Sequence, residues 1–174
     1  MPAIDLSTVQ VQVDDLPSGF MPIDLRMFGM PGFDEFVENP EDIENYVSLV
    51  SMFPLEVIIS FLTQAASQTE QEQMEAYFED PQSMLDQITA QMGEPKEQEI
   101  LTTPTIADRS TAVGVVLTMG EQDFKVEMMV FGRESVAVFV INTHLYGADP
   151  VVSVYDIAAL LDQRLQAALS SAAQ

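Results

Sequence analysis

Three consecutive runs of β-type sequence near the C-terminus constrain the fold more than any other feature. The runs are Ala112–Thr118, Asp123–Phe131 and Ser135–Ile141, and short turns at Met119–Gln122 and Gly132–Glu134 separate them. Each run is rich in β-branched and aromatic residues, which favour strands. Since a short turn between successive strands makes an antiparallel hairpin, the three runs predict a meander.

A long amphipathic helix follows the meander. Its start carries a capping-box variant, Ser153-Val-Tyr-Asp156. Apolar residues then recur at helical spacing: Val154, Ile157, Ala158, Leu160, Leu161, Leu165, Ala168 and Leu169. We expect this helix to pack across the meander. Segregated antiparallel strands and helices predict an α+β fold, with a central antiparallel sheet flanked by helices, in one domain over residues 1–174.

The first hundred residues mix strand and helix signals. Val9–Val13 alternates like a half-buried strand, and Phe20–Leu25 is expected to be a short edge strand marked by Pro22. Pro40 suits the first turn of a helix over Pro40–Leu49. Met52–Gln64 admits a helix, but its β-branched residues favour a strand.

Two further helices and one strand are predicted before the meander. Thr69-Glu-Gln-Glu72 has the form of a capping box, and we expect it to open a helix over Glu70–Glu79. Pro81 divides this helix from a second one over Pro81–Met92, which Gly93 closes. Lys96–Thr103 is expected to be a strand.

Charge and composition exclude several classes of protein. The 174 residues carry 28 acidic and six basic side chains, a formal charge of −22, and residues 1–100 hold 20 of the acids against only Arg26 and Lys96. A nucleic-acid module needs a basic face, which six scattered cations do not make. Without cysteine the chain has no disulfide, thiolate metal site or thiol nucleophile, and one histidine excludes a multi-histidine centre.

The acidic residues have two interpretations. As a solvated face they keep the protein soluble in a high-salt or extracytoplasmic setting. Alternatively they form a docking surface for a basic partner or for cations. The candidate metal ligands are Glu38, Glu41 and Asp42, but the spacing lacks the pattern of a calcium loop, so we expect no cofactor beyond weak calcium binding.

Catalytic groups are sparse. His144 could act as a general base or a pH switch, but a lone histidine at a strand end is more often hydrogen-bonded locally. No Gly-x-Ser-x-Gly elbow and no phosphate-binding glycine loop is present. We therefore predict that the protein is not an enzyme.

An apolar segment offers a candidate partner-binding site. Methionine and phenylalanine crowd into residues 20–33, which glycine and proline residues interrupt, at Met21, Met27, Phe28, Met30 and Phe33. Methionine adapts its shape to different partners, so an exposed segment of this kind would dock on a protein or an apolar ligand. If the segment instead folds under the sheet, it forms a satellite core.

Several stretches resemble a known family. The turn Asp15-Leu-Pro-Ser-Gly-Phe20 resembles the entry of PsbP-like domains. Residues 108–170 resemble uncharacterised cyanobacterial lipoprotein-type sequences, through Ala112–Val116, Met129–Arg133, Tyr146-Gly147 and Leu160–Arg164. The resemblance implies an α/β/α sandwich, residence in the thylakoid lumen or periplasm, and a non-catalytic role beside photosystem II. It assigns no ligand or cofactor residue to this chain.

Two functions follow as hypotheses. The first is a PsbP-like accessory or assembly protein that binds a membrane protein complex from the lumenal or periplasmic side. The second is a carrier for a lipid or small apolar molecule, with a pocket between the sheet and the Met/Phe segment. No run is long enough to span a membrane, and Met1–Leu6 is not a signal peptide as written. We expect an extracytoplasmic protein if a signal has been removed, and a cytoplasmic one otherwise.

Overall fold

The computed structural model describes residues 5–24, 45–65, 67–102 and 104–172. Seven strands form one antiparallel sheet in the order β1-β2-β3-β7-β6-β5-β4. The strands are β1 (Phe20–Pro22), β2 (Val47–Met52), β3 (Leu55–Gln64), β4 (Glu97–Ile100), β5 (Arg109–Met119), β6 (Gln122–Arg133) and β7 (Val136–Leu145). The helices are α2 (Gln68–Glu79), α3 (Pro81–Met92) and α4 (Val154–Ala172).

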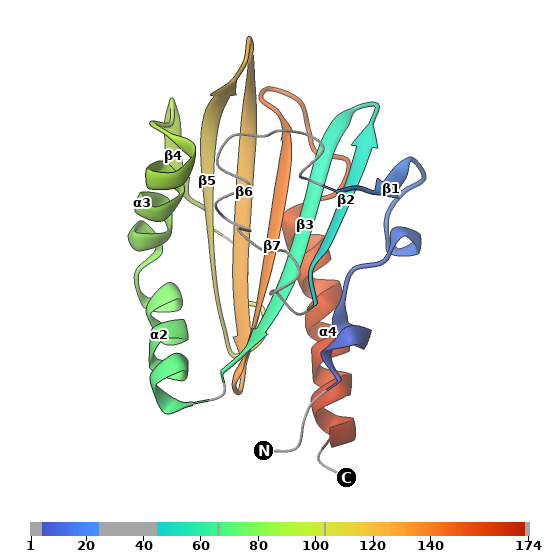
Figure 1. Ribbon diagram of the computed structural model, residues 1–174, viewed down its shortest axis with the longest axis vertical. Coiled ribbons are helices and arrows are strands. Elements are labelled where there is room, and N and C mark those ends of the chain that lie inside the picture. The colour runs from blue at the N-terminus through green and yellow to red at the C-terminus, as the bar shows by residue number, and fades with distance from the viewer. Residues whose placement is uncertain (1–4, 25–44, 66, 103, 173–174) are drawn as a thin grey trace.

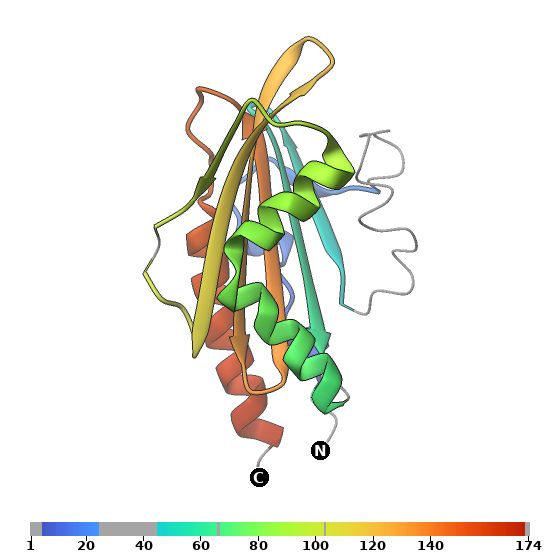
Figure 2. The same cartoon turned by 90° about the vertical axis from the view of Figure 1, so that its left-hand side faces the viewer.

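Helices cover both faces of the sheet. Helix α4 lies against β6 and β7 on one face, while α2 and α3 lie against β4, β5 and β6 on the other (Figure 1). Figure 2 shows the sheet between these two layers. The expected α+β fold, with a central antiparallel sheet flanked by helices, is therefore confirmed.

Strand alternation divides the apolar residues into two cores. On the α4 side, Met129 and Phe131 of β6 and Val138 of β7 pack against Leu161 and Leu165 of α4. On the other side, Val113 and Val115 of β5 pack with Met84 and Leu85 of α3. Since successive side chains of a strand point to opposite faces, the central strands are buried on both sides.

The C-terminal half follows the sequence closely. The turns at residues 120–121 and 134–135 join β5, β6 and β7 as the predicted meander, and α4 lies across it. Helix α3 has the predicted bounds, and Gly93 ends it with a φ of 94°, a left-handed value that glycine tolerates. Strand β1 lies at an edge of the sheet, as Pro22 indicates.

The prediction of a strand at Val9–Val13 is wrong. Val9 ends one 3-10 helix, Leu6–Val9, and Val13 begins another, Val13–Asp15, with no strand between them. Val9 and Val11 are buried in the α4-side core, which explains the alternation without a neighbouring strand. The backbone is satisfied locally instead, because the Asp15 carboxylate accepts a hydrogen bond from the Gln12 amide.

Two other boundaries differ from the sequence prediction. The predicted helix Pro40–Leu49 is wrong at its C-terminal end, where residues 47–49 begin strand β2 and pair with β3 in a hairpin. Residues 40–44 of that prediction lie outside the described residues. Helix α2 begins at Gln68 rather than at the predicted Glu70, and the Ser67 hydroxyl, in place of Thr69, accepts from the Glu70 amide at 3.3 Å. Here long-range strand pairing and an earlier serine outweigh the local patterns.

Candidate functional site: a polar cluster and an apolar end

Polar residues cross the sheet in two adjacent rows on the α4 face. In the first row, Glu56 of β3 pairs with His144 of β7, which pairs in turn with Lys125 of β6. In the second row, Asn142 of β7 pairs with Glu127 of β6. Residues directly opposite one another on antiparallel strands have Cβ atoms about 5 Å apart, so the register alone brings these groups together.

Glu56 holds the connection between β7 and α4. Its side chain is fully buried, and Oε2 accepts a hydrogen bond from the Val151 amide at 2.5 Å. Oε1 accepts from the Val152 amide at 3.2 Å and from Asn142 Nδ2 at 2.9 Å. Asn142 Nδ2 also donates to the Val152 carbonyl at 2.6 Å. Because a buried carboxylate needs such donors, Glu56 and Asn142 form a latch on residues 146–153, the segment that leads into α4.

His144 lies beside this latch and is 5% exposed. Burial lowers the pKa of its imidazole below the ordinary value, although the carboxylates of Glu127, Glu56 and Asp149 act in the opposite direction. Nδ1 has no hydrogen-bond partner among the described residues. The structure therefore places the predicted strand-end histidine within β7 and without a local bond at this nitrogen.

The outer end of the cluster is open to solvent. Lys125 Nζ contacts Glu127 Oε1 at 3.0 Å and Glu99 Oε1 at 3.1 Å. Partial burial alone would lower the pKa of Lys125, but hydrogen bonds to these two carboxylates outweigh it and raise the pKa. Tyr146 Oη donates to Glu97 Oε1 at 2.8 Å, and this bond raises the pKa of the phenol. At this outer end the charged side chains are therefore paired with one another, whereas Nδ1 of the buried His144 has no hydrogen-bond partner among the described residues.

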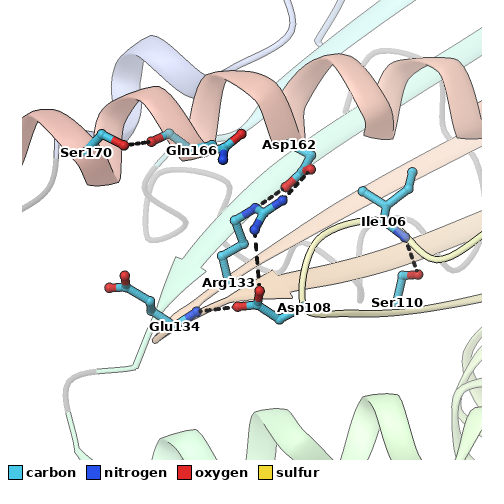
Figure 3. Close-up of polar contacts among 8 residues, drawn as sticks. All are labelled: Ile106, Asp108, Ser110, Arg133, Glu134, Asp162, Gln166 and Ser170. Atoms are coloured by element: carbon cyan, nitrogen blue, oxygen red, sulfur yellow. Dashed lines mark hydrogen bonds and ion pairs between the residues drawn. The ribbon is translucent and has the colours of Figure 1, made fainter.

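Every lysine and arginine in the described part of the chain has a carboxylate partner. Arg133 makes a bidentate contact with Asp162 of α4, from Nε at 2.5 Å and from Nη2 at 2.9 Å (Figure 3). Arg164 pairs with Asp15, Arg109 with Glu75, and Lys96 with Asp123. No group of three or more potential metal-ligating histidine or carboxylate side chains is found among the described residues.

Exposed apolar side chains gather at the β2–β3 turn and on the neighbouring strand β1. Phe53 in this turn is 94% exposed, and its neighbour Met52 is 46% exposed. Met21 of β1 pairs with Val50, so it lies on the same face as Met52 and is 52% exposed. We call Met21, Met52 and Phe53 the apolar end; the β2–β3 turn lies toward the top of Figure 1.

Of the partner-binding and metal-binding residues predicted from sequence, the structure describes only Met21. Met21 is exposed in the apolar end. The other candidates lie outside the described residues: Met27, Phe28, Met30, Phe33, Glu38, Glu41 and Asp42. Sequence reasoning missed Glu56 and Phe53. A single carboxylate inside the apolar run Leu55–Leu62 is the signal that could have drawn attention to Glu56.

The chain shares its fold with a solved structure of low sequence identity. No known family model matches it, and no curated protein matches it. The extracellular domain of PknH from Mycobacterium tuberculosis is similar with a TM-score of 0.56 and 11% identity, covering 96% of this chain and 98% of that one. Of the described helices, none is long and apolar enough to cross a membrane.

Two further structures are more distantly similar. LpqN of Mycobacterium tuberculosis, which is involved in cell envelope biogenesis, has a TM-score of 0.41 and 11% identity, covering 85% of this chain and 78% of that one. A protein of Bacteroides thetaiotaomicron has a TM-score of 0.44 and 9% identity, and the match covers 77% of this chain but only 38% of that one.

Proposed function

We propose that the protein is a non-enzymatic docking module outside the cytoplasm, which binds a basic protein surface through its apolar end. The observation that carries this proposal is Phe53, whose side chain is almost fully exposed beside Met52 and Met21. A large aromatic side chain at a turn between two paired strands is a suitable anchor for an apolar pocket in a partner. Methionine side chains around it can adapt to the shape of that pocket.

Charge selects the kind of partner. The formal charge is −22, and every lysine and arginine in the described part already contacts a carboxylate of the same chain. A basic protein is therefore attracted, whereas an anionic lipid surface or a nucleic acid is repelled. We infer an apolar pocket with a basic rim on the partner. The finer hypothesis from the sequence is that this partner belongs to a membrane protein complex, as for PsbP-like proteins.

Residence outside the cytoplasm is supported by the fold. The extracellular domain of PknH has the same fold over nearly its whole length. The absence of cysteine fits any redox compartment. Protease treatment of intact and of permeabilised cells tests this part of the proposal: degradation of the protein without permeabilisation of the inner membrane supports it, and protection opposes it.

Photo-crosslinking from the turn tests docking directly. p-Benzoylphenylalanine in place of Phe53 should give one discrete protein adduct in cells that naturally make this chain. The same photo-crosslinker in place of Ile100, an exposed residue of β4 far along the sheet, is the matched control. The partner identified from the adduct, once purified, should bind the wild-type protein more weakly as salt is raised.

Variants of the purified protein complete the test. Phe53→Ala should weaken binding to that partner at least tenfold, whereas Ile100→Ala should leave it unchanged. Equal adducts from both positions, or an acidic partner, would contradict the docking proposal. A lipid adduct from position 53 would instead favour the carrier hypothesis.

A further inference from the structure

The single histidine of the chain lies next to the latch that closes the β7–α4 connection. His144 and Glu56 are directly opposite on neighbouring strands, and Glu56 holds the amides of Val151 and Val152. Asn142, two residues before His144 on the same face of β7, shares the Glu56 carboxylate. A change in charge at His144 therefore acts on the group that holds residues 146–153 in place.

We propose that protonation of His144 releases residues 146–153 from Glu56, so that this connection opens reversibly as the solution becomes mildly acidic. Release is a property of the isolated protein and is independent of any docking partner.

The closed arrangement has no place for an imidazolium. The charged groups that face His144 are Glu56 from β3, Glu127 and Lys125 from β6, and Asp149 from the connection itself. Glu56 is already used by two main-chain amides and Asn142, and Glu127 by Lys125. A protonated ring must therefore recruit Glu56, draw in Asp149 from the connection itself, or obtain water. Each of these changes disturbs the arrangement in which Glu56 holds the amides of Val151 and Val152.

The sign of the effect follows from burial. Burial lowers the pKa of His144 in the closed state, whereas in an open, hydrated state the ring returns toward its ordinary value of about 6.5. The open state therefore binds a proton more readily. The closed state therefore has its full stability at pH values above the ordinary histidine pKa of about 6.5. It loses stability as the pH falls from about 6.5 through the lowered pKa that His144 has in the closed state.

Hydrogen exchange on the full chain tests the latch. Protection factors of the Val151 and Val152 amides, corrected for intrinsic exchange, should fall severalfold between pH 7.5 and pH 5.5. The amide of Val126, a buried residue of central strand β6, is the control and should change little. Because the chain has one histidine, its ring resonances in NMR spectra are assigned without ambiguity, and their midpoint should coincide with the loss of protection.

Two variants distinguish the effect of titrating His144 from the effect of titrating the nearby carboxylates. His144→Gln should keep Val151 and Val152 protected at both pH values, and Glu56→Gln should leave them weakly protected at both. The inference is overturned if the wild-type protection does not depend on pH, or if His144→Gln keeps the wild-type dependence. If either variant fails to fold, the coincidence of the two wild-type midpoints decides the question, and separate midpoints reject the latch.

Discussion

Gly132 of β6 shows how a missing side chain can position a helix. A Cβ atom there would lie 2.9 Å from Cζ of Phe78 in α2 and 3.3 Å from Nε of Arg109. The Phe78 ring occupies this space and receives the Arg109 guanidinium at 5.1 Å from its centroid. Arg109 also pairs with Glu75, so the close approach at Gly132 holds α2 against the sheet by three connected contacts.

Gly132→Ala should therefore destabilise the protein by about 1–3 kcal/mol, because the methyl group forces Phe78 from its position. Gly114→Ala in neighbouring β5 is the control, since its Cβ would meet Glu99 and Leu101 at ordinary contact distances of 3.4 and 3.5 Å. The free energy of unfolding, measured with urea, should fall clearly more for Gly132→Ala. Equal losses would contradict the steric explanation.

Asp15 stabilises the folded state by an amount that depends on pH. Burial raises its pKa, but hydrogen bonds from Arg164 and from the Gln12 amide outweigh burial and hold the pKa below the ordinary value of 3.8. Since the folded state lowers this pKa, the stabilisation is complete above pH 3.8 and disappears as the pH falls through the lowered value.

Asp15→Asn should therefore reduce the free energy of unfolding near neutral pH, and the difference from wild type should shrink as the pH falls below 3.8. Urea unfolding at a series of pH values measures it. A difference that does not change with pH would show that Asp15 stabilises by packing rather than by charge.

At the scale of elements, ion pairs fasten α4 to the rest of the molecule. Arg133 links β6 to Asp162 of α4, and Arg164 of α4 holds both the Asp15 carboxylate and the Gln10 carbonyl. These pairs are half-buried and bidentate, which gives them fixed geometry. The N-terminal 3-10 segment and the sheet are thus attached to opposite sides of one helix.

A double-mutant cycle should show that the ion pair between Arg133 and Asp162 is stronger than an exposed ion pair of the same chain. Arg133→Gln and Asp162→Asn should couple by about 1–2 kcal/mol. Lys96→Gln and Asp123→Asn provide the exposed control pair, with an expected coupling below about 1 kcal/mol. Unfolding free energies of the four variants and two double variants measure both couplings, and similar values for the two pairs would contradict the role given to Arg133.

The elements predicted well from sequence are those with local causes. The meander could be predicted because alternation and short turns lie within residues 112–141, and α3 because Pro81 and Gly93 mark its two ends. The prediction of a strand at Val9–Val13 was wrong because Val9 and Val11 are buried in the α4-side core, whose helix lies far along the chain. Glu56 could not be recognised as a latch because its partners, Asn142 and Val151, lie 86 and 95 residues away. Whether Phe53 is exposed likewise depends on which parts of the sheet the helices cover, and the residues near Phe53 in the sequence do not determine this.

For the whole molecule, the acidic charge affects the stability of the folded state in two opposing ways. The chain has 22 more carboxylates than cations, so most carboxylates have no cation of their own. The cations in the described part are already used in ion pairs that join elements. Repulsion among the remaining carboxylates destabilises the compact state, while salt weakens both this repulsion and the ion pairs.

We expect repulsion to dominate. The melting temperature should rise by several degrees when sodium chloride is raised from 0.01 M to 0.15 M, since the screening length falls from about 30 Å to about 8 Å. Differential scanning calorimetry measures the shift, and equal concentrations of potassium chloride control for an ion-specific effect. A fall in melting temperature would show that the ion pairs outweigh the repulsion.

The position of β7 between β3 and β6 has a consequence for the order in which the chain can fold. Strand β3 pairs along its length with residues 136–144, which a ribosome makes only after β4, β5 and β6. Until β7 has been made, β3 has no partner on its inner edge. Contacts between residues so far apart in sequence form slowly, so we expect the sheet to be completed only after most of the chain has been synthesised.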